Sequence, residues 1–298
     1  MVIKKLRSAA KIFLLHSGLH RLFGCKIVGV TSSGNTLLSL NRDCALGSKG
    51  TILELPRDQF IFESVKNLGL WELRESKFLA RGLKRACRQP STKTALLDIG
   101  ANTGLVTLQV MNLSKTSNEV FLFEPVTRHA MAIKQNLKNL SNIHLNEFAL
   151  SDQNGEADIF TEATNHGNTS LLRSIVPDIG MISTQIRLVE TTEYCNKFLN
   201  NFEKYVIKCD TQGMDALILS RIPERIWKNC ESVVIEVWAL PEVIKRDVEV
   251  LLSMCQEFEY VSWRPNVGKK KKIELNEVSE FWLSKSGSSR SLFLSKNI

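Results

Sequence analysis

The sequence has no paired cysteines and no apolar run long enough to cross a membrane. Its seven cysteines are scattered, none forms a Cys-x-x-Cys pair, and their number is odd. This pattern argues against a disulfide framework or a zinc site and favours free thiols in a reducing cytoplasm. A membrane-spanning helix needs about 20 apolar residues. We therefore expect a cytoplasmic globular protein, and a hydrophobic content of 43% allows it a sizeable core.

Several catalytic and binding patterns are also missing. There is no G-x-x-x-x-G-K phosphate loop, no legible Ser-His-Asp arrangement, no histidine at metal-ligand spacing and no internal repeat. The net charge of +8 is partly local, in the run Lys269–Lys272. That run is either a solvated loop or a contact for phosphate, anionic glycan or nucleic acid. The aromatic residues that accompany basic ones on nucleic-acid surfaces are missing nearby, so a nucleic-acid partner is not favoured.

A glycine-rich turn is the most informative feature that is present. An apolar run ends at Asp98, the turn follows, and residues 105–113 have the pattern of an amphipathic helix. Gly100 and Gly104 allow positive φ and a close approach of backbone to ligand. Asn102 is the non-glycine type that best tolerates positive φ. Because a helix N-terminus favours negative charge, the turn indicates a site for a pyrophosphate or for the carboxylate of S-adenosylmethionine (SAM).

A second acid supports a nucleoside ligand. Glu124 ends an apolar run about 20 residues beyond the turn, the separation expected of a carboxylate that binds ribose hydroxyls. Spacing alone leaves both a nicotinamide cofactor and SAM open. Asp98 favours SAM, because an acid just before the turn can meet the methionyl ammonium group and would repel a pyrophosphate.

Six motifs in order resemble those of the FkbM-type SAM-dependent methyltransferases. They are Asp98–Gly104, Phe123–Pro125, Phe148–Asp152, Asn168–Leu171, Lys208–Gly213 and Val233–Val237. The resemblance runs from about Leu53 to near the C-terminus and implies a class I methyltransferase fold that methylates a hydroxyl of a sugar or related natural product. The chain departs from the family at Gln212, where the family usually has a carboxylate.

Alternating strands and helices follow from Thr94 onward. Predicted strands are Ala95–Ile99, Glu119–Phe123, Ile143–Phe148, Tyr205–Cys209, Ser232–Trp238 and Glu259–Trp263, with helices at Val126–Leu137, Met214–Arg221 and Pro241–Cys255, and a closing hairpin of Phe281–Lys285 and Ser291–Ser295. This alternation predicts an α/β fold with a doubly wound, mostly parallel Rossmann-like sheet. In the resembled family, one late strand runs antiparallel. We expect residues 91–298 to form the SAM-binding domain and residues 1–90 an N-terminal extension.

The extension divides into two parts. Strands Lys26–Val30 and Thr36–Leu40 precede helices at Phe60–Leu68 and Leu73–Arg88. Residues 1–23 alternate basic and apolar residues, as in a basic amphipathic helix. Such a helix either packs on the domain or contacts the inner membrane surface peripherally.

Acids at strand ends are the candidates for catalysis. Asp210 and Glu236 stand in apolar strands, where a carboxylate is costly to bury unless it is paired or bound to metal. Asp210 is the preferred base for the acceptor hydroxyl, with Glu236 as its partner. A magnesium ion held by these two acids and Gln212 is one alternative. The other is that Asp210 only orders the loop above SAM.

Two further segments complete the predicted site. Ala149 and Leu150 end a strand where adenine would rest, and Asp152 could accept its amino group. The resemblance places the polar loop 164–171 near the active site, which makes His166 an alternative base. Asn168 and Ser170 are then acceptor contacts.

The favoured function is O-methylation of a sugar or glycan hydroxyl with SAM as cofactor. The positive charge suggests a nucleic-acid methyltransferase instead, but the Asn/Asp-Pro-Pro-aromatic block of such enzymes is absent at Asp210. Gln212 keeps open a third reading, a SAM-binding protein without catalytic activity.

Overall fold

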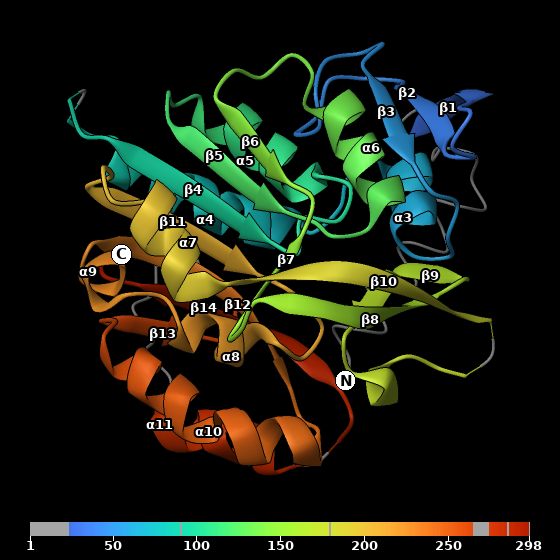
Figure 1. Ribbon diagram of the computed structural model, residues 1–298. Helices are drawn as coiled ribbons and strands as arrows, with labels where there is room; N and C mark the ends of the chain where they lie inside the picture. Colours follow the sequence, from blue (N-terminus) through green and yellow to red (C-terminus); the bar gives the residue numbers. More distant parts are fainter. Residues whose placement is uncertain (1–23, 90, 179, 265–273, 285, 298) are drawn as a thin grey trace, which may run out of the picture.

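The computed structural model describes residues 24–297 except 90, 179, 265–273 and 285. Its centre is a sheet in the order β13-β14-β12-β11-β4-β5-β6 (Figure 1). These strands are β4 (Thr94–Ile99), β5 (Glu119–Phe123), β6 (Ile143–Asn146), β11 (Lys204–Cys209), β12 (Cys230–Trp238), β13 (Tyr260–Ser262) and β14 (Ser289–Ser295).

The sheet is doubly wound. β4, β5 and β6 run parallel outward in one direction, and β11 and β12 run parallel in the other, so the strand order reverses between β4 and β11. Only β14 is antiparallel to its neighbours β12 and β13 among these strands. The predicted α/β architecture with one late reversed strand is therefore confirmed.

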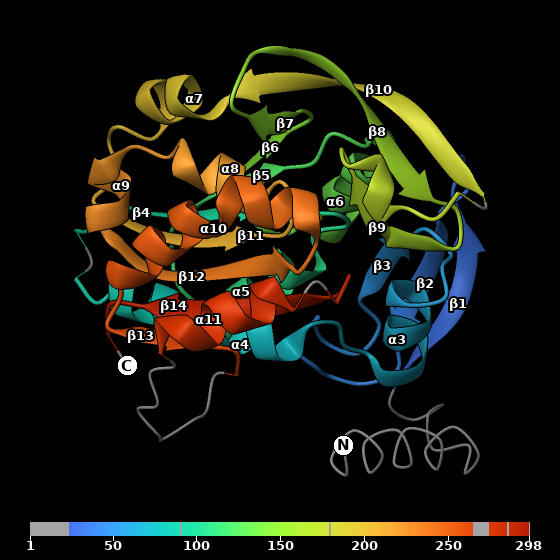
Figure 2. The ribbon, with the colours of Figure 1, turned by 90° about the horizontal axis from the view of Figure 1, so that it is seen from below.

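Both faces of the sheet are buried, because successive strand residues enter different cores. Leu96 and Val206 face one core, and Leu97 and Ile207 face the other. Helices of the first core are α3 (Ile61–Leu68), α4 (Leu73–Ala86), α5 (Leu105–Ser114) and α6 (Thr127–Asn136). Helices of the second core are α7 (Thr191–Phe198), α8 (Asp215–Ser220), α9 (Glu224–Lys228), α10 (Pro241–Gln256) and α11 (Leu275–Leu283) (Figure 2). None of the helices in the described parts of the chain has the length and apolarity that a bilayer span requires.

Helix α5 is not amphipathic as predicted. All six residues from Leu105 to Val110 are buried, including Thr107 and Gln109. The reason is that α4 packs along α5 and covers its outer side.

The N-terminal part adds a small antiparallel sheet. Its strands are β1 (Cys25–Val30), β2 (Thr36–Leu40) and β3 (Ile52–Leu55), and β3 packs on α6. Both predicted strands and both predicted helices of this part are confirmed within two residues. Helix α4, which the sequence assigns to the extension, packs against β11 and β12 of the central sheet. The division at residue 90 stays a prediction.

A second sheet, in the order β7-β10-β8-β9, was not predicted. It consists of β7 (Ala149–Ser151), β8 (Gly155–Glu162), β9 (Asn165–Ser170) and β10 (Met181–Glu190), with the short 3-10 helix η1 (Arg173–Ile175) between β9 and β10. Figure 1 shows it extending past the carboxyl ends of β4 and β11. Two predictions are corrected here. The segment 164–171 is largely a strand, and the strand predicted to end at Phe148 ends at Asn146, so Ala149 begins a strand of the other sheet.

One strand of the predicted closing hairpin is confirmed, and the other is wrong. Ser291–Ser295 lies in β14, but Phe281–Lys285 is not a strand, because α11 extends to Leu283. Val278, Phe281 and Trp282 are buried, and their spacing of three and four residues forms one helix face.

Candidate functional site

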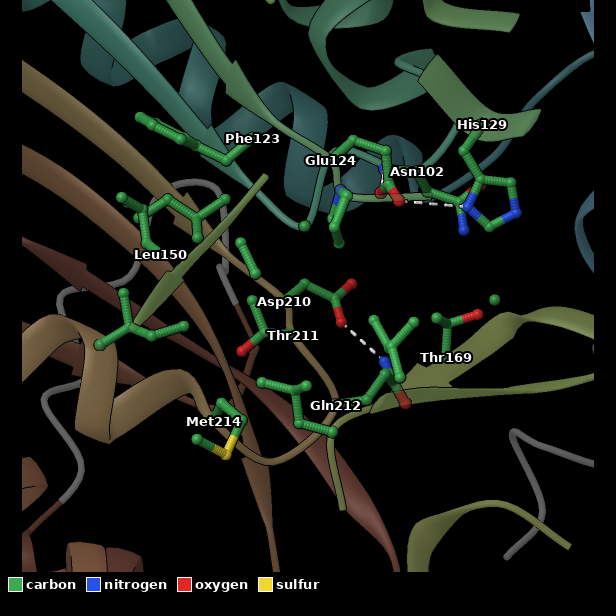
Figure 3. A pocket seen from close by; sticks show the side chains of 18 residues that line it. Asn102, Phe123, Glu124, His129, Leu150, Thr169, Asp210, Thr211, Gln212 and Met214 are labelled. Atoms are coloured by element: carbon green, nitrogen blue, oxygen red, sulfur yellow. Dashed lines mark hydrogen bonds and ion pairs between the residues drawn. The ribbon is translucent and has the colours of Figure 1, made fainter. Parts of the chain in front are cut away.

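Two adjoining cavities open at the carboxyl ends of the parallel strands. The first, here called the Glu124 cavity, has an open volume of about 580 Å³. Most of its wall is apolar, with the carboxyl groups of Glu124 and Asp210 and one imidazole (Figure 3). Residues that characterise it are Phe123, Glu124, His129, Ala149, Leu150 and Met214. An apolar cavity with few fixed polar groups is typical of a site for a small organic ligand.

The second, here called the Trp238 cavity, is wider and more polar, with an open volume of about 980 Å³. The residues that line this cavity and not the first include Trp71, Glu72, Asn168, Lys208, Glu236 and Trp238. Five residues line both cavities, namely Gly100, Asn102, Gly167, Asp210 and Gln212. Two ligands, one in each cavity, would therefore meet at this shared wall.

The glycine-rich turn forms part of that wall. Gly100, Asn102 and Gly104 have φ values of +76°, +50° and +73°, as the residue types suggest. A Cβ atom on Gly100 would lie 1.9 Å from the carbonyl oxygen of Asp210. Glycine is thus required at position 100 because the loop after β11 approaches it, a contact between distant segments that spacing could not reveal. Gly104 precedes α5 as its N-cap residue.

Glu124 is fixed against the turn. Its Oε2 accepts a hydrogen bond of 2.8 Å from the backbone N–H of Asn102, and its Oε1 accepts one of 2.9 Å from Val126. The carboxylate therefore keeps a fixed place in the wall of the Glu124 cavity, where a ribose hydroxyl could donate to it.

Asp98 lies beneath the turn instead of in a cavity. Its side chain is buried and lines neither cavity. Oδ2 accepts a 2.6 Å hydrogen bond from the Thr107 hydroxyl, and Oδ1 lies 3.4 Å from Nζ of Lys208. The structure thus gives Asp98 partners within the protein and does not bring it to the place where an ammonium group was expected.

Of the residues predicted near adenine, Ala149 and Leu150 line the Glu124 cavity. Asp152 does not, although it follows β7 directly. It accepts a hydrogen bond of 3.1 Å from the Ser151 hydroxyl.

Asp210, Gln212 and Glu236 come together at the shared wall. Nε2 of Gln212 donates hydrogen bonds of 2.7 Å to Oδ1 of Asp210 and 2.7 Å to Oε2 of Glu236. Glu236 also accepts from Nε1 of Trp238 at 2.8 Å and from the Ser289 hydroxyl at 2.7 Å. Burial, and then the charges of Asp210 and Asp215, raise the pKa of Glu236 well above its usual range.

Sequence reasoning missed Lys208. Its Nζ donates a 3.1 Å hydrogen bond to the carbonyl of Gly100 and lies 3.5 Å from Oδ2 of Asp210. Burial alone would lower the pKa of Lys208, but the charges of Asp98, Asp210 and Glu72 raise it above its ordinary value. One charged residue within the apolar run Tyr205–Cys209 was the signal that could have identified it.

The two central histidines lie on the Glu124 side. His166 is buried and lines neither cavity, and its ring packs edge-on against His129 with centroids 5.9 Å apart. Burial, together with the charges of His129 and Arg128, lowers the pKa of His166 to about 4. His129 was not predicted as a site residue, yet it lines the Glu124 cavity, and its Nδ1 lies 3.4 Å from Oε1 of Glu124 (Figure 3). Neither of its buried ring nitrogens makes a hydrogen bond within the described chain.

The residues at the shared wall do not fit a magnesium ion. Carboxylates are the usual protein ligands of Mg²⁺, and between the two carboxyl groups this chain has the neutral amide of Gln212, whose nitrogen donates a hydrogen bond to each of them. Both oxygens of Glu236 already accept hydrogen bonds. Across the described residues, no three His, Cys, Asp or Glu side chains converge as a metal site would need.

The solved structures similar to this chain include several methyltransferases. A SAM-dependent methyltransferase from Agrobacterium tumefaciens is 11% identical, with 91% of this chain and 72% of that one covered and a TM-score of 0.43. Fibrillarin from Aeropyrum pernix with bound SAM is 11% identical, with 91% and 99% covered and a TM-score of 0.36. Precorrin-6y C5,15-methyltransferase from Geobacter metallireducens is 13% identical, with 73% and 88% covered and a TM-score of 0.34. No protein-family model and no curated protein matches the chain.

The fold is that of the class I methyltransferases. The strand order of the central sheet and its one reversed strand define it.

Proposed function

We propose that this chain is a SAM-dependent O-methyltransferase that acts on a hydroxyl of a sugar or glycan. The observation that carries the proposal is the pair of adjoining cavities with a shared wall at Asp210. A methyl donor and an acceptor bound in two such cavities would have their reacting atoms side by side. Correct alignment of reacting groups accounts for a large part of the catalysis of group transfer.

The Glu124 cavity suits the nucleoside of SAM. Glu124 accepts from ribose hydroxyls, and Leu150 and Met214 offer apolar surface to adenine. Two residues that line this cavity have a buried polar atom without a hydrogen-bond partner within the described chain, namely Oδ1 of Asn102 and Oγ1 of Thr211. Bound SAM supplies a methyl group on a positively charged sulfur.

The Trp238 cavity suits a sugar. Trp71 and Trp238 provide ring surfaces for the apolar face of a pyranose, and the amide of Asn168 can bond its hydroxyls. Asp210 takes the proton of the acceptor hydroxyl as the new oxygen–carbon bond forms and the sulfur–carbon bond breaks, and then returns it to solvent. The resemblance to FkbM-type enzymes supports this assignment, because several of its motifs surround the two cavities. Residues 1–23, which lie outside the described part, are proposed to contact anionic membrane surfaces.

Three measurements test the proposal. Calorimetry should detect SAM binding, and SAM with a labelled methyl group should transfer the label to oligosaccharides but not to RNA. Mass spectrometry of surface glycans from cells with and without the protein should show a difference of one methyl mass. Label transfer to RNA alone would replace the proposal with a nucleic-acid methyltransferase. SAM binding without transfer to any acceptor would leave a SAM-binding protein.

A further inference from the structure

Gln212 occupies the junction between the two cavities in a strained conformation. Its φ is +53°, in the left-handed region that non-glycine residues rarely adopt. A strained residue persists only where surrounding interactions fix it, and such residues cluster at functional sites.

Three side chains hold this loop. The buried carboxylate of Asp215 accepts hydrogen bonds from the backbone N–H groups of Thr211 and Gly213, at 2.9 and 3.0 Å. The buried Ser170 hydroxyl of β9 donates to the carbonyl of Gln212 at 2.6 Å, and Arg246 donates to the carbonyl of Gly213 at 2.6 Å. The backbone on either side of Gln212 is therefore fixed from α8, β9 and α10.

The side chain then joins two acids with one nitrogen. An amide nitrogen has two hydrogens, and both of those on Gln212 are used, one for Asp210 and one for Glu236. Two carboxyl groups placed this close repel each other when both are charged. A donor shared by the two groups offsets that repulsion. A divalent cation offsets the repulsion between carboxylates in the same way where three acids converge.

We propose that Gln212 is a positioning residue that holds Asp210 and Glu236 at the junction in place of a metal ion, so that the reaction needs no divalent cation. Only the kinetic test of this inference rests on the proposed methyl transfer. The metal-binding test concerns the side chains of Asp210, Gln212 and Glu236 and requires no acceptor.

The binding test uses Mn²⁺ as the probe. Electron paramagnetic resonance should show no stoichiometric Mn²⁺ binding to the wild-type protein. Gln212→Glu places a third carboxylate between the two acids and should gain one site, with an affinity at least roughly tenfold above wild type. Gln185→Glu makes the same chemical change on an exposed part of β10 and should gain none. One equivalent of Mn²⁺ bound by the wild-type protein and lost in Asp210→Asn would overturn the inference.

The first part of the kinetic test uses the wild-type protein. A chelator should leave wild-type methyl transfer unchanged. Gln212→Ala should lower kcat by about 10²-fold, because two carboxylates lose their shared donor, while the Kd for SAM and the KM for the acceptor change little. Methyl transfer by Gln212→Glu should be slow with chelator and recover with added Mg²⁺.

Two outcomes would refute the inference and leave the proposed function standing. One is wild-type methyl transfer that stops with chelator, and the other is methyl transfer by Gln212→Ala at the wild-type rate. A wild-type protein that methylates nothing would instead remove the proposed function.

Discussion

At the scale of single residues, one positive charge balances several negative charges in the Trp238 cavity. Lys208 is the one cation that lines the Trp238 cavity among the described residues, and Glu72, Asp210 and Glu236 line it as acids. The position of this lysine, within hydrogen-bonding distance of the Gly100 carbonyl, ties the glycine-rich turn to the loop that carries Asp210. A change to one charge of this group therefore alters the others.

Asp210→Asn tests the proposed general base while keeping the shape of the side chain. Loss of a general base typically costs about 10²–10⁴ in rate, and we expect single-turnover methyl transfer to fall within that range. SAM affinity by calorimetry should change much less, because Glu124 and the apolar wall remain. A variant that transfers methyl at the wild-type rate, or that fails because SAM no longer binds, would show that Asp210 has no catalytic role.

Glu72 predicts a pH dependence of stability. Burial, and then the charge of Asp210, raise the pKa of Glu72 from 4.5 to about 8, although Lys208 opposes the shift and Glu75 and Asp98 add to it. Between pH 4.5 and 8 the unfolded chain loses this proton while the folded chain keeps it. The free energy of unfolding therefore falls as pH rises through this window. Glu72→Gln removes that contribution, and urea midpoints of variant and wild type should diverge from pH 5 to pH 8. Parallel midpoints would contradict the assignment.

At the scale of elements, the sequence predicts the central sheet well and the second sheet poorly. In β12, for example, Val233 and Ile235 are buried in one core and Val234 in the other, so the apolar run is clear in the sequence. In β10, by contrast, residues Ile182–Gln185 are exposed, so burial leaves no such pattern there. Glu124 and Asp210 directly follow β5 and β11, and Asp98 and Glu236 lie within β4 and β12 near their carboxyl ends. Apart from the pairing of Asp210 with Glu236, the partners of these acids were not predicted. Lys208 joins β11 to the neighbouring β4 and its turn, and Ser170 joins the second sheet to the loop after β11. No local pattern encodes such contacts.

Gly100 allows a matched test of one such contact. Gly100→Ala and Gly50→Ala both force alanine into positive φ, at +76° and +86°. The Cβ at position 50 meets nothing within 4 Å, whereas the one at position 100 meets the carbonyl of Asp210. Strain alone should cost Gly50→Ala roughly 1–2 kcal/mol of unfolding free energy. Gly100→Ala should lose roughly 1–3 kcal/mol more from the clash and bind SAM more weakly. Equal losses in the two variants would mean that the turn and the loop do not press on each other.

At the scale of the whole molecule, positive charge and apolar residues are concentrated in residues 1–23 of the sequence. If this segment is a peripheral anchor, the full chain should sediment with anionic vesicles at low salt and less so at high salt, because salt screens surface attraction.

Deletion of residues 1–23 should abolish vesicle binding and leave the affinity for SAM unchanged. The second part is the control, since both cavities are built from residues beyond position 59. A full-length chain that ignores anionic vesicles at low salt would instead support a segment packed on the domain.

The shared wall of the two cavities has a practical consequence for inhibitor design. Because Gly100, Asn102 and Asp210 belong to both cavities, only a short tether is needed to connect a ligand in one with a ligand in the other. When one half of such a compound is bound, the other half is held at a high effective concentration. An adenosine analogue joined through a few atoms to a sugar could exceed the affinity of either half by about 10²–10⁴-fold. The length of the best tether would then measure, in solution, how far apart donor and acceptor lie.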